Sequence, residues 1–531
     1  MNDPYLPQAG IVAMQRGDFA RAEAIFAQIV IADPESHQSW GMLSIIAILS
    51  GKPELGLEHA RKAVALERRN PGYLNAMGVA LGELGLLPEA KAALLKALRE
   101  SPTYAEAHYN LGKTLFKMED LKAASVAYGR AYALDKDYPG VRFNWAYTKR
   151  QMGDLSGAKD LLLELLSKNP DDGDAAVQLS EIESFGLGKE ALQRHLESFV
   201  KQNPRLAAVR DQLARFYLSH GCYELGWTEH WLRMALPDSV QSQRYNTPIS
   251  YLPEVMDGST VLIRAEQGIG DVLFFLRFLD RLRKRGARTV VEVQSKLFAI
   301  TKRSNIADEV IEQCSEEELA WRSARCHTQI WAGDLALLTR AFEVAPPVRL
   351  AQDEQQLQMW RDRLAAFGPP PYLGLTWRAG TDISRSAEFD SSKNPNRALA
   401  KRIPLDQLMS VIRTWPGTCV SIQREPYPEE TATIGKSLAH PLLDLSHLND
   451  DLNAMLAVLG CLDDYVCVSN TNLHLRAGLG LGGHVLIPES EYRWTANGAS
   501  SPWFPAWKVY RKDESGWAGA ISALTNKLKE Q

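Results

Sequence analysis

The sequence has few cysteines, no long apolar run and no excess of basic residues, and each absence excludes a class of protein. Its six cysteines form no C-x-x-C pair or other metal-site spacing, so we expect reduced thiols. No apolar run is long enough to span a membrane. The first residues, MNDPYLPQ, have neither the basic nor the apolar part of a signal peptide. We therefore expect a cytoplasmic protein with no membrane span.

The overall charge and composition are those of an ordinary globular protein. Formal net charge is −4, apolar residues make up 45% and charged residues 23%. No basic field would attract nucleic acid, so we expect no nucleic-acid partner. The 531 residues are enough for two to four domains.

Several catalytic motifs are also missing. There is no G-x-S-x-G elbow and no cysteine context for nucleophilic catalysis. Asp463 and Asp464 are adjacent rather than a spaced D-x-D pair, and no His/Cys spacing indicates zinc. The sequence therefore predicts no metal site.

The first part of the chain has a 34-residue period. Five of its seven positions are glycine: Gly17, Gly51, Gly85, Glu119, Gly153, Leu187 and Gly221. A small residue follows most of them after five positions, and an apolar one after nine. Proline recurs seventeen positions on, at Pro34, Pro102, Pro170 and Pro204. Small residues let two helices approach closely, and proline ends the second helix, so the period predicts stacked helix–turn–helix units.

This pattern resembles the tetratricopeptide repeat (TPR). The pair Trp40 and Leu43, and the glycines Gly78 and Gly112, occupy positions typical of its first helix. We expect about seven repeats over residues 1–236, of which the second and sixth are degenerate. The concave surface of such an array is suited to holding a protein chain.

After a polar, proline-bearing linker at 237–251, apolar runs alternate with helical patterns. Strands are expected at 261–265, 289–294, 372–377, 418–423 and 464–469, and helices at 271–286, 353–367, 405–414, 427–438 and 450–462. Such alternation predicts parallel sheets covered by helices. Three prolines at 369–371 divide this region into 252–368 and 369–531.

The segment EQGIGDVLFF (266–275) follows the first of these strands. Gly268 and Gly270 allow a tight turn and close backbone approach by a ligand, and a helix begins at Asp271. On these residues alone, Asp271 is as well explained as a helix cap.

This segment resembles the first strand–helix turn of the heptosyltransferase-like glycosyltransferases, and more closely their TPR-linked branch. Other segments resemble that group in the same order: GWTEHWLRM (226–234), GLTWRAGT (374–381), RIPLDQL (402–408), SNTNLHLRAGLG (469–480) and SPWFPAWKVYR (501–511). The resemblance implies a TPR solenoid followed by the GT-B fold, which has two Rossmann-like lobes, here 252–368 and 369–531.

The resemblance also implies roles for residues of the first lobe. Asp271 would be the general base that takes the proton from the acceptor hydroxyl, and a carboxylate at a helix N-terminus stays ionised for this task. Glu266 and Gln267, with Gly268 and Gly270, would bind the substrate. No cofactor is expected, because the nucleotide-sugar donor is itself a substrate.

The second lobe would bind the donor nucleotide. Its phosphates need cations or N–H donors, which Arg378 could supply together with Gly380 and Thr381. Ser469, Asn470, Thr471 and His474 follow the strand at 464–469, where ligands bind in open α/β sheets. For Arg378 a solvated surface position, and for His474 a structural one, stay open. Relatives often have aspartate where this chain has Ser469.

These features favour an inverting, metal-independent glycosyltransferase that moves a hexosyl, nonulosonyl or heptosyl group to a protein. The resemblance includes flagellin glycosyltransferases, so serine or threonine of a protein such as flagellin, recruited by the TPR groove, is the expected acceptor. Two alternatives stay open: an inactive TPR adaptor that keeps a sugar-nucleotide-binding fold, and a cell-envelope glycolipid glycosyltransferase.

Overall fold

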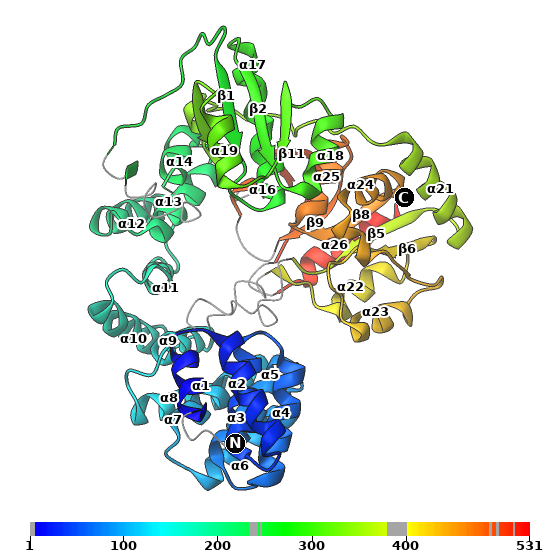
Figure 1. Cartoon of the computed structure of the whole chain (residues 1–531). Coiled ribbons are helices and arrows are strands. Elements are labelled where there is room, and N and C mark those ends of the chain that lie inside the picture. The colour runs from blue at the N-terminus through cyan, green and yellow to red at the C-terminus, as the bar shows by residue number, and fades with distance from the viewer. Residues whose placement is uncertain are drawn as a thin grey trace. The chain divides into compact units, whose positions relative to one another are not determined.

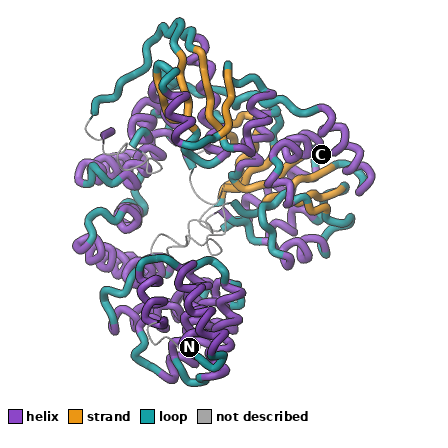
Figure 2. Tube along the Cα trace, in the orientation of Figure 1, coloured by secondary structure: helices purple, strands orange, loops and turns teal. Residues whose placement is uncertain are grey.

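The computed structural model describes residues 6–232, 243–244, 247–379, 401–487, 491–494, 499–512 and 516–530. They form two compact units, which we call the repeat unit, ending at Gly188, and the C-terminal unit, starting at Lys189. Among these residues the repeat unit is entirely helical, and every strand belongs to the C-terminal unit (Figure 2). The boundary lies inside the 34-residue repeat region, not at its end.

The repeat unit is a series of antiparallel helix pairs (Figure 1, blue to cyan). Its helices are α1 (Leu6–Gln15), α2 (Phe19–Ala32), α3 (His37–Leu49), α4 (Pro53–Leu66), α5 (Pro71–Glu83), α6 (Leu87–Glu100), α7 (Ala105–Lys117), α8 (Leu121–Leu134), α9 (Val141–Gln151), α10 (Leu155–Lys168) and α11 (Gly173–Glu183). The predicted helical repeats are confirmed.

The turn between the two helices of a pair explains the glycine period. The period positions with left-handed backbone, φ between 62° and 83°, are Gly17, Gly51, Gly85, Glu119, Gly153 and Gly221. Glycine adopts this conformation without strain, which side chains rarely do. Leu187 departs from the period, because the left-handed residue of its repeat is Gly186, one position earlier.

The other repeated positions confirm the expected packing. Ala22, Ala90 and Ala124 are fully buried between helices. A Cβ on Gly112 would lie only 2.7 Å from the Tyr128 ring, so the two helices touch there. Each of the four periodic prolines lies two residues beyond the end of a helix, where it cannot disturb the helix interior.

Three more helices keep the 34-residue spacing but belong to the C-terminal unit. They are α12 (Lys189–Gln202), α13 (Ala207–Ser219) and α14 (Tyr223–His230). Leu218 and Trp227 are part of the same buried cluster as strand residues such as Ile263. These helices therefore pack into the α/β core.

The first sheet is four-stranded and parallel, in the order β3-β2-β1-β4. Its strands are β1 (Thr260–Arg264), β2 (Arg288–Val293), β3 (Glu309–Glu312) and β4 (Thr328–Trp331). The connecting helices are α16 (Ile269–Phe275), η1 (Leu276–Phe278), α17 (Leu279–Lys284), α18 (Ser295–Arg303), α19 (Glu316–Ser323), η2 (Ala332–Asp334) and α20 (Leu335–Leu338). The single helix expected at 271–286 is thus divided by a 3₁₀ turn.

The second sheet has seven strands in the order β10-β11-β9-β8-β5-β6-β7, and only the β10–β11 pair is antiparallel. Its strands are β5 (Tyr372–Thr376), β6 (Thr418–Ser421), β7 (Leu443–Asp444), β8 (Asp464–Val468), β9 (Gly483–Ile487), β10 (Ser500–Ser501) and β11 (Phe504–Arg511). Its helices are α21 (Glu354–Phe367), α22 (Leu405–Ile412), α23 (Pro428–Gly435), η5 (Ser446–Asp450), α24 (Leu452–Cys461), α25 (Thr471–Gly478), η6 (Tyr492–Trp494) and α26 (Ala518–Lys529).

The two sheets meet through the helices that follow their central strands. The chain leaves the carboxyl end of β1 into α16 and that of β8 into α25, and α16 packs against α25 (Figure 1). One buried cluster, with Phe274, Tyr465 and Trp503 among its members, joins both sheets. The candidate site lies where α16 and α25 touch.

Candidate functional site

Gly270 lets α16 approach α25 closely. A Cβ on this residue would lie 3.1 Å from Cδ2 of His474 and 3.6 Å from Cα of Thr471. The sequence predicts a close approach of this glycine to a ligand, whereas in the structure Gly270 approaches α25 of the chain itself. A Cβ on Gly268 would make an ordinary van der Waals contact with Oδ2 of Asp271, at 3.5 Å.

Asp271 lies in the first turn of α16 and forms an ion pair with Arg493 of η6. The Arg493 side chain is largely buried and the Asp271 side chain is about one-third exposed. The guanidinium lies 4.8 Å from the Phe274 ring centre, and its Nε donates to the Tyr492 hydroxyl at 3.2 Å. Burial works against its charged form, but Tyr492 and Asp271 outweigh burial and raise the pKa of Arg493. Sequence reasoning missed Arg493, which stands in a polar segment without a motif.

His474 lies one turn into α25 and is only 5% exposed. The Phe274 and Phe504 rings meet it edge-on, with centroids 6.4 and 5.2 Å away. Burial, and then the charges of Arg493, Arg277 and Lys401, lower the pKa of His474 well below its usual value, so the imidazole is neutral at pH 7. No hydrogen bond to either ring nitrogen is found within the described ranges.

Arg277 is a second buried arginine beside this group. Its guanidinium donates to the carbonyl oxygens of Phe274 at 2.9 Å, Ala345 at 3.0 Å and Trp503 at 3.1 Å. It also stacks 4.2 Å from the Phe274 ring centre. Burial, and then Arg493, lower the pKa of Arg277 to about 9, which leaves it charged at neutral pH.

The residues at the start of α25 make contacts within the protein. Ser469 donates from Oγ to Glu491 at 3.1 Å, and Lys401 contacts the other oxygen of Glu491 at 2.9 Å. Asn470 caps the helix, since its Oδ1 accepts from the Leu473 amide at 3.0 Å. Thr471 is the first helical residue and lies next to Gly270.

The other residues predicted for the first lobe lie at the same turn. Glu266 accepts a hydrogen bond from the Gly333 amide at 3.2 Å, which ties the turn to η2. The Gln267 carbonyl accepts from the Gln294 side chain at 2.9 Å. In this structure both residues brace the turn that carries Asp271.

Arg378 lies apart from this group. Its Nε is 3.3 Å from an oxygen of Glu430, its Nη2 donates to the Glu425 carbonyl, and it stacks 4.6 Å from the Tyr427 ring centre. No contact between Arg378 and His474 or Asp271 is found in the part of the chain that the structure describes. Gly380 and Thr381 lie outside that part.

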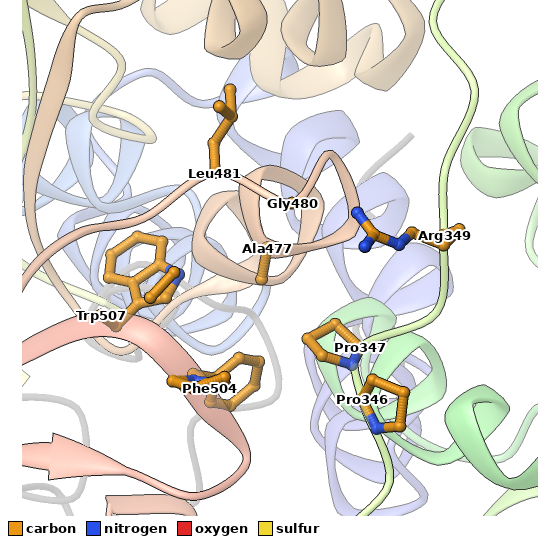
Figure 3. Close-up of a pocket in the computed structure, with 10 residues that line it drawn as sticks. Pro346, Pro347, Arg349, Ala477, Gly480, Leu481, Phe504 and Trp507 are labelled. Carbon is orange, nitrogen blue, oxygen red and sulfur yellow. The ribbon is translucent and has the colours of Figure 1, made fainter.

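A cavity of about 180 Å³ opens at the other end of α25 (Figure 3). Pro346, Pro347, Leu481 and Trp507 line it, and Arg349 points toward Gly480 at its edge. None of the residues predicted for the site lines this cavity. Its wall includes Phe504, whose ring also meets His474.

Among the described residues, no helix has the length and apolarity to cross a membrane. The same residues contain no cluster of three or more His, Cys, Asp or Glu side chains placed to hold a metal ion.

Comparison with known proteins places tetratricopeptide repeats in the N-terminal region. Two tetratricopeptide repeat families match, one over residues 8–73 and 75–140 and the other over 115–180. The matched residues lie in the repeat unit, so the predicted repeats are confirmed there.

Among relatives, Protein FlbA of Caulobacter vibrioides is 24% identical over 98% of this chain and 83% of its own length. The type IV pilus assembly protein PilF of Pseudomonas aeruginosa is 28% identical over 35% of this chain and 78% of its own length. A solved structure of Pseudomonas aeruginosa PilF, 20% identical, covers 38% of this chain and 90% of its own with a TM-score of 0.33. The similarity to FlbA extends across both units, whereas the families cover the repeats alone.

Proposed function

We propose that the chain is an inverting, metal-independent glycosyltransferase of the GT-B type that transfers a sugar from a nucleotide-sugar to a protein. The observation that supports this most directly is the contact between α16 and α25. It brings Gly270, which precedes Asp271 and follows β1 of one sheet, against His474, which follows β8 of the other. Ligands of open α/β sheets bind at such carboxyl ends.

In the proposed reaction Asp271 is the base. Its carboxylate takes the proton of an acceptor hydroxyl while that oxygen attacks the anomeric carbon of the sugar. The bond from this carbon to the phosphate oxygen breaks, its electron pair leaves with the nucleoside diphosphate, and the configuration inverts. The positive charge of Arg493 and Arg277 would favour the leaving phosphate.

His474 would meet the donor as a neutral group. Its imidazole is buried, contacts Gly270 and has ring nitrogens with no protein partner among the described residues, so one of them is available to a sugar or phosphate oxygen. Asn470 would act mainly as the cap that orients α25. Arg378 would bind phosphate only after leaving Glu430.

The repeats would recruit the acceptor. Repeat arrays bind extended chains on their inner surface, and the resemblance to flagellin glycosyltransferases makes serine or threonine of flagellin the first acceptor to test. One observation favours the alternative, an adaptor that binds sugar nucleotides without transfer: the Asp271 carboxylate is already paired with Arg493.

The test combines mass analysis with binding. Intact masses of flagellin and other candidate acceptors are compared between cells with the gene, without it, and with Asp271→Asn. We expect a sugar-sized mass loss in the deletion strain and in the variant, with transfer by purified Asp271→Asn reduced by about 10²-fold or more. Full transfer by Asp271→Asn would exclude this residue as the base. Tight donor binding without transfer to any acceptor would favour the adaptor.

A further inference from the structure

The charges around Asp271 do not balance. Arg277 is buried and Arg493 is largely buried, and their charges act on each other. Asp271 is the carboxylate that pairs with Arg493, whereas Arg277 contacts only carbonyl oxygens and aromatic rings in the described residues. The nearby Lys401 is already paired with Glu491. The charge of Glu491 also acts on Arg493, so three cations, Arg493, Arg277 and Lys401, face two carboxylates in this cluster.

Unused donors point to where an anion would lie. Arg493 uses Nε and Nη2 for Tyr492 and Asp271, and no hydrogen bond of its Nη1 is found among the described residues. His474 presents ring nitrogens with no partner there. Both groups are next to the turn, since His474 lies against Gly270 and Arg493 pairs with Asp271, whose Oδ2 is 3.5 Å from where a Cβ on Gly268 would lie.

Protonation of Asp271 has a consequence for Arg493. When the carboxylate accepts a proton, Arg493 loses its ion-pair partner, and only the charge of Glu491 still opposes that of the neighbouring Arg277. A buried charge that loses its partner is strongly disfavoured. Another anion that takes the place of Asp271 at Arg493 would restore the lost pairing. A phosphate group does so, because guanidinium binds phosphate oxygens in the same forked geometry as a carboxylate.

We propose that Arg493 is an anion-exchange residue: it holds Asp271 in the resting protein, moves to the diphosphate of the donor when the donor binds, and thereby frees Asp271 to accept the proton. This inference rests on the proposed function. It assigns the donor diphosphate to Arg493 and predicts that donor binding precedes proton transfer. Arg378, held by Glu430, has no part in the exchange.

The experiment is a double-mutant cycle on the full-length protein, with inorganic pyrophosphate titrated by calorimetry. In Arg493→Gln, binding should weaken about 10-fold or more, the size expected for a charged hydrogen bond. In Asp271→Asn, binding should tighten several-fold because Arg493 is free in advance. In the double variant this gain should vanish, since Arg493 is the residue through which Asp271 competes with the anion.

Two controls keep the result specific. Arg322→Gln, a partly exposed arginine on α19 paired with Glu318, should leave pyrophosphate binding unchanged. Arg493→Lys retains the positive charge but not the forked N–H donors of the guanidinium, and it should bind pyrophosphate more tightly than Arg493→Gln. Far-UV circular dichroism and melting of each variant confirm folding.

The outcomes separate this inference from the function. Asp271→Asn could tighten pyrophosphate binding by the same factor in the wild-type and the Arg493→Gln backgrounds. The gain would then come only from removing the repulsion between the carboxylate and the anion, and the exchange would be wrong even where sugar transfer is observed. If Arg493→Gln binds as the wild type does, the anion lies elsewhere. A coupled cycle without transfer to any acceptor would support the exchange while the proposed reaction fails. If Arg493→Gln does not fold, the same cycle with Arg493→Lys decides between these outcomes.

Discussion

Helices with the same 34-residue spacing have different surroundings in the two units. In the repeat unit, helices contact their neighbours along the chain, and the buried residues are mostly alanine and leucine, with a few aromatic rings such as Phe26 and Tyr128. In the C-terminal unit, Trp227 of α14 is fully buried against Phe275, Phe278 and Trp503, with ring centroids within 6.1 Å. A repeat thus becomes part of another core by exchanging one surface residue for a large apolar one.

The position of Trp227 shows this exchange in the sequence. In steps of 34 residues back from Trp227, the equivalent residues are Gln193, Lys159, Ser125, Lys91, Leu57 and Glu23. Apart from Leu57, these side chains are polar, as suits a helix face that meets solvent or a neighbouring turn. The last repeat has tryptophan there because it meets α16 and η1 instead.

The largest expected effect breaks this contact. Trp227→Ala should lower the free energy of unfolding of the C-terminal unit by about 3–5 kcal/mol, because it removes a fully buried aromatic side chain and leaves a cavity. Denaturant unfolding followed by hydrogen exchange of β1 and α16 measures it. Lys159→Ala, at the equivalent position of the repeat unit, should change stability by less than about 0.5 kcal/mol. Similar losses in both variants would mean that the two surroundings do not differ.

A second contrast uses ion pairs. In the C-terminal unit Arg244 and Asp334 pair at 2.5 Å with both side chains buried, and Arg244 also donates to the Trp231 carbonyl. Asp334→Ala should cost about 3 kcal/mol, since it leaves a buried arginine without its carboxylate. In the repeat unit Lys159 and Glu183 pair at 2.8 Å with both side chains partly exposed. Glu183→Ala should cost about 0–1 kcal/mol, and thermal unfolding of the two variants compares them.

The sequence predicts the repeats well, because the information is local. A glycine with positive φ, a small residue and a proline recur at fixed positions in most repeats, and each has one physical reason. The strands expected at 261–265, 372–377 and 464–469 are likewise observed, because buried parallel strands form continuous apolar runs. The break of the helix after Phe275 and the pairing of β11 with β9 depend on contacts between distant segments, which no local pattern specifies.

The candidate site shows the same limit. The glycine-flanked Asp271 and the strand end before His474 are visible as motifs, and the structure brings them together. The roles of Arg493 and Arg277 cannot be predicted from the sequence, because nothing in it distinguishes a buried arginine from a solvated one. The guanidinium of Arg378, which the sequence suggests for phosphate, is held by Glu430. Only packing determines which arginine is available.

The pH dependence of stability should also differ between the units. Burial, together with Arg493, Arg277 and Lys401, lowers the pKa of His474 well below its usual value. Below about pH 6.5 the unfolded chain binds a proton at this residue and the folded chain does not, so acidification destabilises the fold. As long as the folded chain stays unprotonated at this residue, each further pH unit of acidification costs up to about 1.4 kcal/mol.

His474→Gln should remove this loss from the pH profile of unfolding of the C-terminal unit. The control is His59→Gln in the repeat unit. Burial lowers the pKa of His59 as well, but the ring is only half-buried and Glu58 opposes the shift. A smaller change is expected there. An unchanged profile in His474→Gln would show that His474 does not take part.

The smallest expected effect sharpens the repeat side of the comparison. Glu119 has the left-handed backbone, φ 62°, that the corresponding turns give to glycine. Glu119→Gly should therefore stabilise the repeat unit by roughly 0.5–1 kcal/mol, the strain relieved being partly offset by the greater entropy of glycine in the unfolded chain. The reverse change, Gly85→Ala, should destabilise by a similar amount through the backbone alone, because a Cβ on Gly85 meets no atom within 4 Å. Hydrogen exchange of α7 and α8 in the full chain measures the first, and that of α5 and α6 the second. If Glu119→Gly lowered protection, the glutamate side chain would be contributing more than its backbone strain costs.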